Sequence, residues 1–238
     1  MPIDRLTAAD RVMVWADQVW PQDIAALAIL DRTPRMEAVA AAIAARLHLV
    51  PRFRQLLDVP PPDLGGPHWT DDPGFDLGHH LHAASLPAPG DEATLLALTA
   101  QLMGRRMDRS RPLWEMWFLS GMAGGRAAMY ARTHHAIADG IAGIATLASF
   151  LDTDREAQPS APEPWAPAAP PTEDALRADH RRERTDAGRR RLTKLVHPIA
   201  TARRVLSAAP AFRELVADRE ISATWLDRRA GLGRRLAL

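Results

Sequence analysis

The 238-residue sequence contains no cysteine, only one tyrosine, and no apolar run that approaches the ~20 residues a membrane-spanning helix needs. The absence of cysteine excludes a disulfide framework and a thiol nucleophile, and it fits a reducing cytosol. Residues 1–7 lack a basic region followed by an apolar run, so no signal peptide is predicted. We expect a folded cytoplasmic protein that would meet lipid only peripherally, at the inner face of the membrane.

The net charge of +1 conceals two parts of opposite charge. Residues 175–238 carry 16 basic and 7 acidic side chains, a net charge of +9, whereas residues 1–174 have a net charge of −8. Six prolines lie between residues 153 and 172, a composition typical of a semi-rigid linker. We therefore predict a folded part at 1–152, a proline-rich linker at 153–172 and a basic helical tail at 173–238.

The tail begins with a highly charged helix and continues with apolar residues at helical spacing: Leu192, Leu195, Val196 and Ile199. A basic amphipathic helix of this kind can lie on an anionic membrane or lipid-droplet surface. Alternatively its apolar stripe packs against the first part of the chain, which the short stripe and the interrupting Pro198 favour. No nucleic-acid partner is predicted, because the arginines have no interleaved aromatic residues and no known binding motif.

The segment most suggestive of chemistry is residues 130–140, Tyr-Ala-Arg-Thr-His-His-Ala-Ile-Ala-Asp-Gly. Residues 126–133 have the composition of a strand, and residues 141–151 carry apolar side chains at helical spacing. His134 and His135 therefore lie at a strand-to-helix junction, where a rigid strand can aim a side chain at a ligand. Because side chains alternate along a strand, only one of them can face a given pocket.

A neutral imidazole, with an ordinary pKa near ~6.5, can take a proton from a hydroxyl, which makes His134 or His135 a candidate general base. Asp139 could fix the tautomer of that ring or hold the loop by pairing with a cation, and Gly140 would let the chain turn. The alternative is that the histidines end a strand, one of them buried, with Asp139 as a helix N-cap. No metal site is predicted, since adjacent histidines diverge and no cysteine is available.

Periodicity predicts the remaining elements: helices at 7–18, 34–47, 91–106 and 173–191, and strands at 24–30, 53–58, 113–119 and 126–135. Thr7 with Asp10 forms an imperfect capping box. The last two strands would form a hairpin that brings residues 112–115 beside the histidines. We interpret Trp114 as a core residue, since tryptophan in a strand mainly supplies bulk for packing.

Three further histidines, His79, His80 and His82, invite interpretation as a metal site, because His80 and His82 would share one face of a strand. No third ligand lies at a useful spacing from them. We therefore interpret all three as ordinary polar residues of a strand.

The segment 134–140 matches the HHxxxDG signature of acyltransferases related to chloramphenicol acetyltransferase and to peptide-synthetase condensation domains. Its flanks resemble the bacterial wax ester synthase/diacylglycerol acyltransferase family. These flanks are Asp-Arg-Ser-Arg-Pro-Leu-Trp-Glu at 108–115, Phe-Asp-Leu at 75–77 followed by His80, and Leu-Pro-Ala-Pro-Gly at 86–90. The order of motifs follows that family over residues 1–152.

The resemblance implies an α/β fold, one half of a chloramphenicol acetyltransferase-like two-layer sandwich with a mixed sheet. It implies that His135 is the general base for attack of a diacylglycerol or long-chain alcohol on an acyl-CoA thioester, with no cofactor beyond this co-substrate. His134 and Asp139 would be mainly structural and Gly140 part of the motif. The resemblance also places Pro112, Leu113, Trp114, Glu115 and His80 at substrate-binding positions, with His80 near the acceptor entrance.

Members of the family resemble two such halves with the substrate tunnel between them, and residues 231–238 look like the segment that leads into the second half. One alternative is therefore a non-catalytic half that binds lipid or a separate second-half polypeptide. Another is an acyltransferase with a different acceptor, closer to the condensation domains. The Pro-Leu-Trp-Glu context at residues 112–115 argues against the latter.

Overall fold

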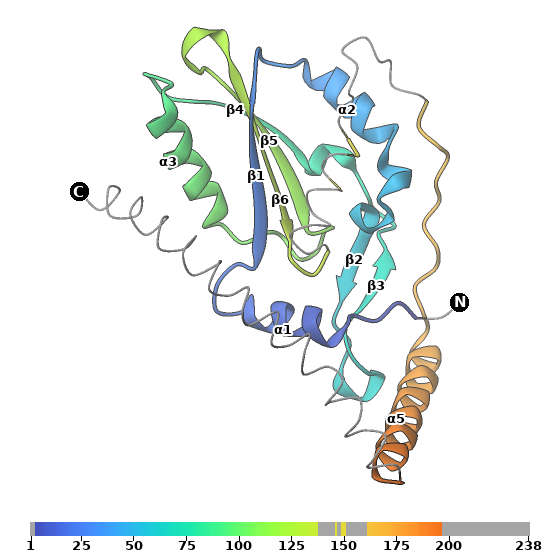
Figure 1. Ribbon diagram of the computed structural model, residues 1–238. Helices are drawn as coiled ribbons and strands as arrows, with labels where there is room; N and C mark the ends of the chain where they lie inside the picture. Colours follow the sequence, from blue (N-terminus) through green and yellow to red (C-terminus); the bar gives the residue numbers. More distant parts are fainter. Residues whose placement is uncertain (1–2, 138–145, 147–148, 151–160, 197–238) are drawn as a thin grey trace, which may run out of the picture. The chain divides into compact units, whose positions relative to one another are not determined.

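The computed structural model describes residues 3–137, 146, 149–150 and 161–196, with side chains to residue 189 (Figure 1). The chain divides into two compact units, residues 1–180 and 181–238. Every described element except the second part of helix α5 (Glu173–Val196) belongs to the first unit. None of the described helices is long and apolar enough to cross a bilayer.

A four-stranded mixed sheet with the strand order β1-β6-β5-β4 forms the centre of the first unit. Its strands are β1 (Asp23–Leu30), β4 (Leu81–Ser85), β5 (Trp114–Ser120) and β6 (Ala127–His134). β6 runs antiparallel to β1 and β5, and β4 runs parallel to β5. The predicted hairpin of β5 and β6 is confirmed, in a register that pairs Trp114 with Thr133. The expected α/β fold class with a mixed sheet is likewise confirmed.

Two helices cover opposite faces of this sheet (Figure 1). On one face, Ile43 of α2 (Met36–Ala44) belongs to the same core cluster as Trp114 and Met116. On the other face, α3 (Glu92–Met103) contributes to a cluster that contains Tyr130. The central strands are therefore buried on both sides, which explains the nearly continuous apolar composition of β5 and β6.

The predicted helix starts at Thr7 and near residue 91 are confirmed. α1 (Ala8–Ala16) follows Thr7, whose hydroxyl oxygen accepts the Asp10 N–H at 3.2 Å. α3 follows Asp91, whose carboxylate accepts the Thr94 N–H at 2.9 Å. Each cap satisfies a backbone donor that the helix itself cannot pair.

A separate antiparallel ribbon consists of β2 (Gln55–Asp58) and β3 (His68–Asp71). The predicted strand at 53–58 is too long at its start, because Phe53 lies in a 3-10 helix and its ring stacks on Trp114 with 4.4 Å between centroids. The 3-10 helices are η1 (Leu47–Leu49), η2 (Pro51–Arg54), η3 (Pro62–Leu64), η4 (Leu77–His79) and η5 (Ala123–Gly125).

β1 lies at an edge of the sheet, although its run of apolar residues is also typical of a buried strand. Among the described strands it pairs with β6 alone. Leu27 and Ile29 are 39% and 48% exposed. Both pair with β6 residues on the face that carries α3. Apolar composition cannot distinguish an edge strand from a central one, since both need one apolar face.

Residues 161–180 belong to the first unit and pack against other parts of it. The guanidinium of Arg54 lies 4.5 Å from the ring centroid of Trp165. Leu176 is 5% exposed, and Arg5 pairs with Asp179 at 2.7 Å. Residues 153–160 of the expected linker lie outside the described part of the chain, and its predicted boundaries at 152 and 172 stay a prediction.

Candidate functional site

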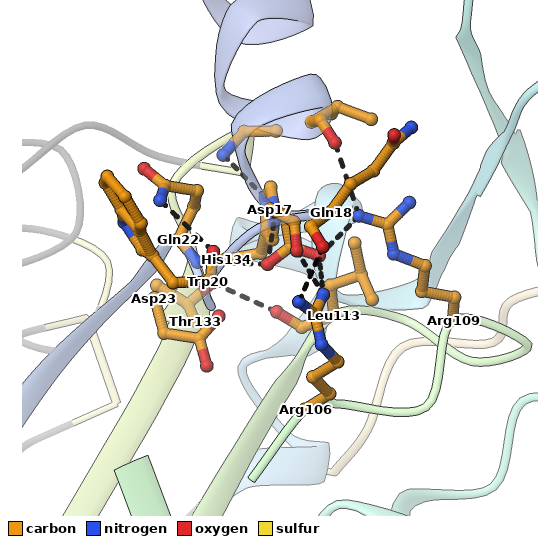
Figure 2. Close-up of polar contacts among 12 residues, drawn as sticks. Asp17, Gln18, Trp20, Gln22, Asp23, Arg106, Arg109, Leu113, Thr133 and His134 are labelled. Atoms are coloured by element: carbon orange, nitrogen blue, oxygen red, sulfur yellow. Dashed lines mark hydrogen bonds and ion pairs between the residues drawn. The ribbon is translucent and has the colours of Figure 1, made fainter. Parts of the chain in front are cut away.

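His134 is the last residue of β6, and its ring is buried at 2% exposure. Its backbone N–H donates to the Leu113 carbonyl at 2.9 Å. Its Nδ1 accepts the Ala136 N–H at 3.0 Å, so the proton of the neutral ring is on Nε2. Nε2 points toward the end of α1 and lies 3.8 Å from Asp17 Oδ1 (Figure 2). That separation is an electrostatic contact, longer than a hydrogen bond.

The charge state of His134 follows from its burial. Burial lowers the pKa of the His134 imidazole to about 4, although the negative charge of Asp17 acts in the opposite direction. The ring is therefore neutral at pH 7. A neutral, buried imidazole with a fixed tautomer suits a structural role, and the assignment of that role to His134 stays a prediction.

His135 follows the end of the strand and is half-buried. Its backbone N–H donates to the Gln22 carbonyl at 2.8 Å, which fastens it to the residue before β1. Its Nδ1 is buried and has no hydrogen-bond partner within the described part of the chain. Asp139 and Gly140 lie outside the described residues, so their predicted roles stay predictions.

Asp17 is the polar residue of this region that the sequence patterns missed. It ends α1 and is 6% exposed. Its Oδ1 accepts the Gln22 N–H at 3.0 Å, and its Oδ2 lies 2.5 Å from Arg109 and 3.5 Å from Arg106 (Figure 2). Burial raises the pKa of Asp17, but the Gln22 N–H and the Arg109 guanidinium outweigh burial and hold that pKa below its ordinary value. Asp17 is therefore an anion at neutral pH.

A second buried ion cluster is centred on Arg132, two residues before His134 in β6. Its Nε lies 2.5 Å from Glu115 Oε1, and its Nη1 lies 3.2 Å from Asp23 Oδ2. Nη1 also donates to the Leu102 carbonyl at 2.7 Å. The Arg132 and Asp23 side chains are only 3% and 2% exposed. This cation thereby joins β1, β5, β6 and the end of α3.

The pKa values of the two carboxyl groups in this cluster are shifted in opposite directions. Burial raises the pKa of Asp23 to about 6, since the attraction of Arg132 offsets only part of the desolvation. Burial also raises the pKa of Glu115, but the His82 ring, whose Nε2 lies 3.5 Å from Oε2, and the Arg132 guanidinium outweigh burial and bring that pKa to about 2. Glu115, a predicted substrate-binding residue, is thus an ionised partner of Arg132, and its role toward substrate stays a prediction.

Trp114 is a core residue, as interpreted from its strand, with 2% exposure. Its indole N–H donates to the Phe53 carbonyl at 2.8 Å, and its ring stacks on His80 with 4.5 Å between centroids. Pro112 and Leu113 are buried beside it. These predicted substrate-binding residues therefore pack inside the fold next to the histidine turn.

His80 is buried at 3% exposure, with its Nδ1 2.8 Å from the Trp114 carbonyl oxygen. Burial lowers the pKa of its ring, so it is neutral. The prediction that it shares a strand face with His82 is wrong: His80 ends the 3-10 turn η4, and β4 begins one residue later. The Asp76 carboxylate, which accepts the Gly78 N–H at 2.8 Å, caps this turn and keeps His80 out of the strand.

A small cavity of about 40 Å³ lies between Phe53, Trp114, the start of β1 and the end of β6. Its volume holds one or two water molecules, whereas ligand sites commonly exceed ~300 Å³. A larger open depression of about 410 Å³ lies over the β2–β3 ribbon and reaches Arg109. Across the part of the chain that the structure describes, no group of three or more His, Asp or Glu side chains is arranged to hold a metal ion.

The model of the wax ester synthase/diacylglycerol acyltransferase catalytic domain matches residues 6–238. The chain is 47% identical over 130 residues to the probable diacylglycerol O-acyltransferase tgs1 of Mycobacterium tuberculosis, which covers 54% of this chain and 28% of that protein. It is 33% identical over 174 residues to the probable diacylglycerol O-acyltransferase tgs3 of the same organism, covering 71% and 64% respectively. The chain therefore spans less than a third of the length of tgs1.

Solved structures agree with the fold. The wax ester synthase/diacylglycerol acyltransferase of Marinobacter aquaeolei VT8 superposes with a TM-score of 0.51 at 27% identity, over 60% of this chain and 37% of that one. The starter condensation domain of rhizomide synthetase matches with a TM-score of 0.51 at 17% identity, over 63% and 36%, which shows the fold alone. Because the family model covers nearly the whole sequence, the chain belongs to the wax ester synthase/diacylglycerol acyltransferase family.

Proposed function

We propose that the chain carries the general base of an acyl-CoA-dependent O-acyltransferase, with His135 as that base. The observation that carries the proposal is the division of labour between two adjacent histidines. Each ring has one buried nitrogen without a hydrogen-bond partner among the described residues, Nε2 in His134 and Nδ1 in His135. The His134 ring is 2% exposed, its Nδ1 accepts the Ala136 N–H and its Nε2 faces Asp17, whereas the His135 ring is only half-buried. The greater exposure of His135 supports its assignment as the ring that takes part in proton transfer.

In the proposed reaction, His135 accepts the proton of the acceptor hydroxyl as the hydroxyl oxygen attacks the thioester carbonyl of an acyl-CoA. The new C–O bond forms the ester, the C–S bond breaks, and the imidazolium returns its proton to the departing CoA thiolate. Diacylglycerol would give triacylglycerol, and a long-chain alcohol would give a wax ester. No cofactor takes part in this direct transfer, and the chain has no cysteine to form a thioester intermediate.

The segment 112–115 supports this proposal through its position. The Leu113 carbonyl accepts the His134 N–H, and the next residue, Trp114, pairs with Thr133 of β6. The Pro-Leu-Trp-Glu segment therefore supports the histidine turn from inside the core. We propose that it shapes the substrate site chiefly by holding that turn, with Asp139 and Gly140 completing the loop.

The direct test incubates the purified chain with radiolabelled palmitoyl-CoA and either diacylglycerol or hexadecanol, and measures labelled neutral lipid. We expect product from the wild type and none from His135→Ala. His79→Ala is the matched control, since the His79 side chain is 45% exposed and pairs only loosely with Asp76 at 3.9 Å. Equal product from wild type and a folded His135→Ala variant would exclude His135 as the base.

A second candidate function is that of a half that works by docking with a separate second-half polypeptide. It is favoured by four exposed apolar side chains on α1 and the turn after it, each between 57% and 71% exposed: Val12, Trp15, Val19 and Trp20. Large exposed apolar side chains that gather on one helix and the turn after it commonly mark an interaction site. Co-purification with a second-half polypeptide of the family, lost in Trp15→Arg, would support this candidate, and activity of the isolated chain would argue against it.

We also propose that the basic tail holds the protein at an anionic lipid surface from the cytoplasmic side. The net charge of +9 over residues 175–238 supports this, because each basic residue near such a surface adds attraction that salt screens. Flotation with vesicles that contain anionic lipid should recover the protein at low salt and lose it at high salt. Recovery that is equal with neutral vesicles would contradict an electrostatic contact.

A further inference from the structure

We infer that Asp17 is a positioning residue that orients both histidines of the catalytic turn through one buried carboxylate. The inference rests on the proposed role of His135 as the base. It assigns to a residue 117 positions upstream a role that the HHxxxDG signature does not contain. Asp17 reaches the turn by two routes, one through the backbone and one through a ring.

The backbone route runs through Gln22. Asp17 Oδ1 accepts the Gln22 N–H at 3.0 Å, and the Gln22 carbonyl accepts the His135 N–H at 2.8 Å. Two hydrogen bonds therefore connect the carboxylate to the backbone of His135. A change in the position of Gln22 would move the point from which the His135 side chain projects.

The ring route runs through His134 (Figure 2). Its Nδ1 accepts the Ala136 N–H, so the Nε2–H faces Asp17 Oδ1 at 3.8 Å. A negative charge at this position favours the tautomer that lets Nδ1 accept from Ala136. The Ala136 N–H bond in turn fixes the turn in which His135 lies.

Two arginines hold the carboxylate in place from the loop that precedes β5. Arg109 contacts Asp17 Oδ2 at 2.5 Å, and Arg106 donates to the Asp17 and Gln18 carbonyls as well. This loop continues into Leu113, whose carbonyl accepts the His134 N–H. Asp17 thus closes a ring of contacts that joins the end of α1, the start of β1, the loop and the end of β6.

The inference predicts that the geometry of the turn depends on the charge and the acceptor oxygen of Asp17. Asp17→Asn keeps an oxygen for the Gln22 N–H but loses the charge that faces Arg109. Asp17→Leu loses both. Asp4→Asn is the control, because it also removes a carboxylate that pairs with an arginine, Arg52 at 2.7 Å, but this carboxylate is 54% exposed and precedes α1.

The test combines three measurements on the full chain and its variants. Ring nitrogen and carbon NMR signals report the tautomers of His134 and His135, and the rate of His135 carbethoxylation by diethyl pyrocarbonate, followed by peptide mass spectrometry, reports its accessibility. Transfer kinetics supply kcat and KM. We expect Asp17→Leu to shift the signals of both rings, change the modification rate and lower kcat about 10- to 100-fold with little change in KM, as displacement of a catalytic group does.

Asp17→Asn should have the same effects to a smaller degree, and Asp4→Asn should match the wild type. Unchanged ring signals and an unchanged modification rate in a folded Asp17→Leu or Asp17→Asn protein would overturn the inference. If Asp17→Leu does not fold, the ring signals and the modification rate of Asp17→Asn alone test the inference. A wild-type chain without transferase activity would count against the proposed function, whereas the NMR and modification data would still decide the role of Asp17.

Discussion

The ionisation of Asp23 should lower the stability of this protein as the pH rises. Its pKa is about 6 in the folded chain against an ordinary value of 3.8, so the folded state binds this proton more tightly than the unfolded chain. Stability from this group is complete below pH ~4 and is lost as the pH rises through about 6. A difference of about two pKa units corresponds to about 3 kcal/mol.

The substitution Asp23→Asn isolates this effect. Its amide cannot ionise, yet its oxygen can accept the hydrogen bond from Arg132 that Asp23 accepts at 3.2 Å. We expect the free energy of unfolding of the variant, relative to wild type, to improve by up to about 3 kcal/mol between pH 4 and pH 8. The side chain is 2% exposed, so solvent screening reduces this value little.

Urea titrations followed by tryptophan fluorescence, which seven tryptophans make sensitive, would measure this difference across the pH range. Asp4→Asn is the control, since the Asp4 side chain is 54% exposed. The reasoning is refuted if the difference between Asp23→Asn and wild type stays constant with pH. It is refuted more strongly if the variant becomes less stable relative to wild type as the pH rises. The attraction of Arg132 would then outweigh burial in setting the pKa of Asp23.

Two further perturbations test the core around the site. Arg132→Met should lower the free energy of unfolding by about 3–5 kcal/mol at pH 7, because it leaves two buried carboxyls without their cation; a loss below about 1 kcal/mol in urea titration would show that water reaches the cluster. Trp114→Ala should cost about 3–5 kcal/mol by removing a ring that stacks on Phe53 and His80. Near-ultraviolet circular dichroism should show the loss of this stack, and a wild-type spectrum would contradict it.

Several features could be predicted from the sequence because their causes are local. The caps at Thr7 and Asp91 lie within three residues of the N–H groups they accept, and the β5–β6 hairpin is set by a short glycine-rich turn between two apolar runs. The assignment of Trp114 to the core followed from the apolar strand around it. Such features can be predicted because each depends on a few residues that are close together in the sequence.

Other features depended on neighbours that are distant in sequence. β1 is an edge strand because, among the described strands, only β6 pairs with it, and β6 begins 97 residues after β1 ends. The partners of Arg132 come from β1 and β5, with Asp23 109 residues away. A pattern search does not connect such residues, since nothing about an isolated arginine or aspartate indicates its partner.

The sequence by itself determined the family, the α/β class and the two adjacent histidines at the end of a strand, because motif spacing and apolar periodicity are properties of neighbouring residues. Only the tertiary structure decided how the two histidines differ. Burial and the Ala136 N–H fix the ring of His134, and Asp17 reaches both histidines through contacts from the end of α1. Those contacts exist because folding brings the end of α1, the start of β1 and the end of β6 together. At this buried position the low local dielectric strengthens each electrostatic interaction.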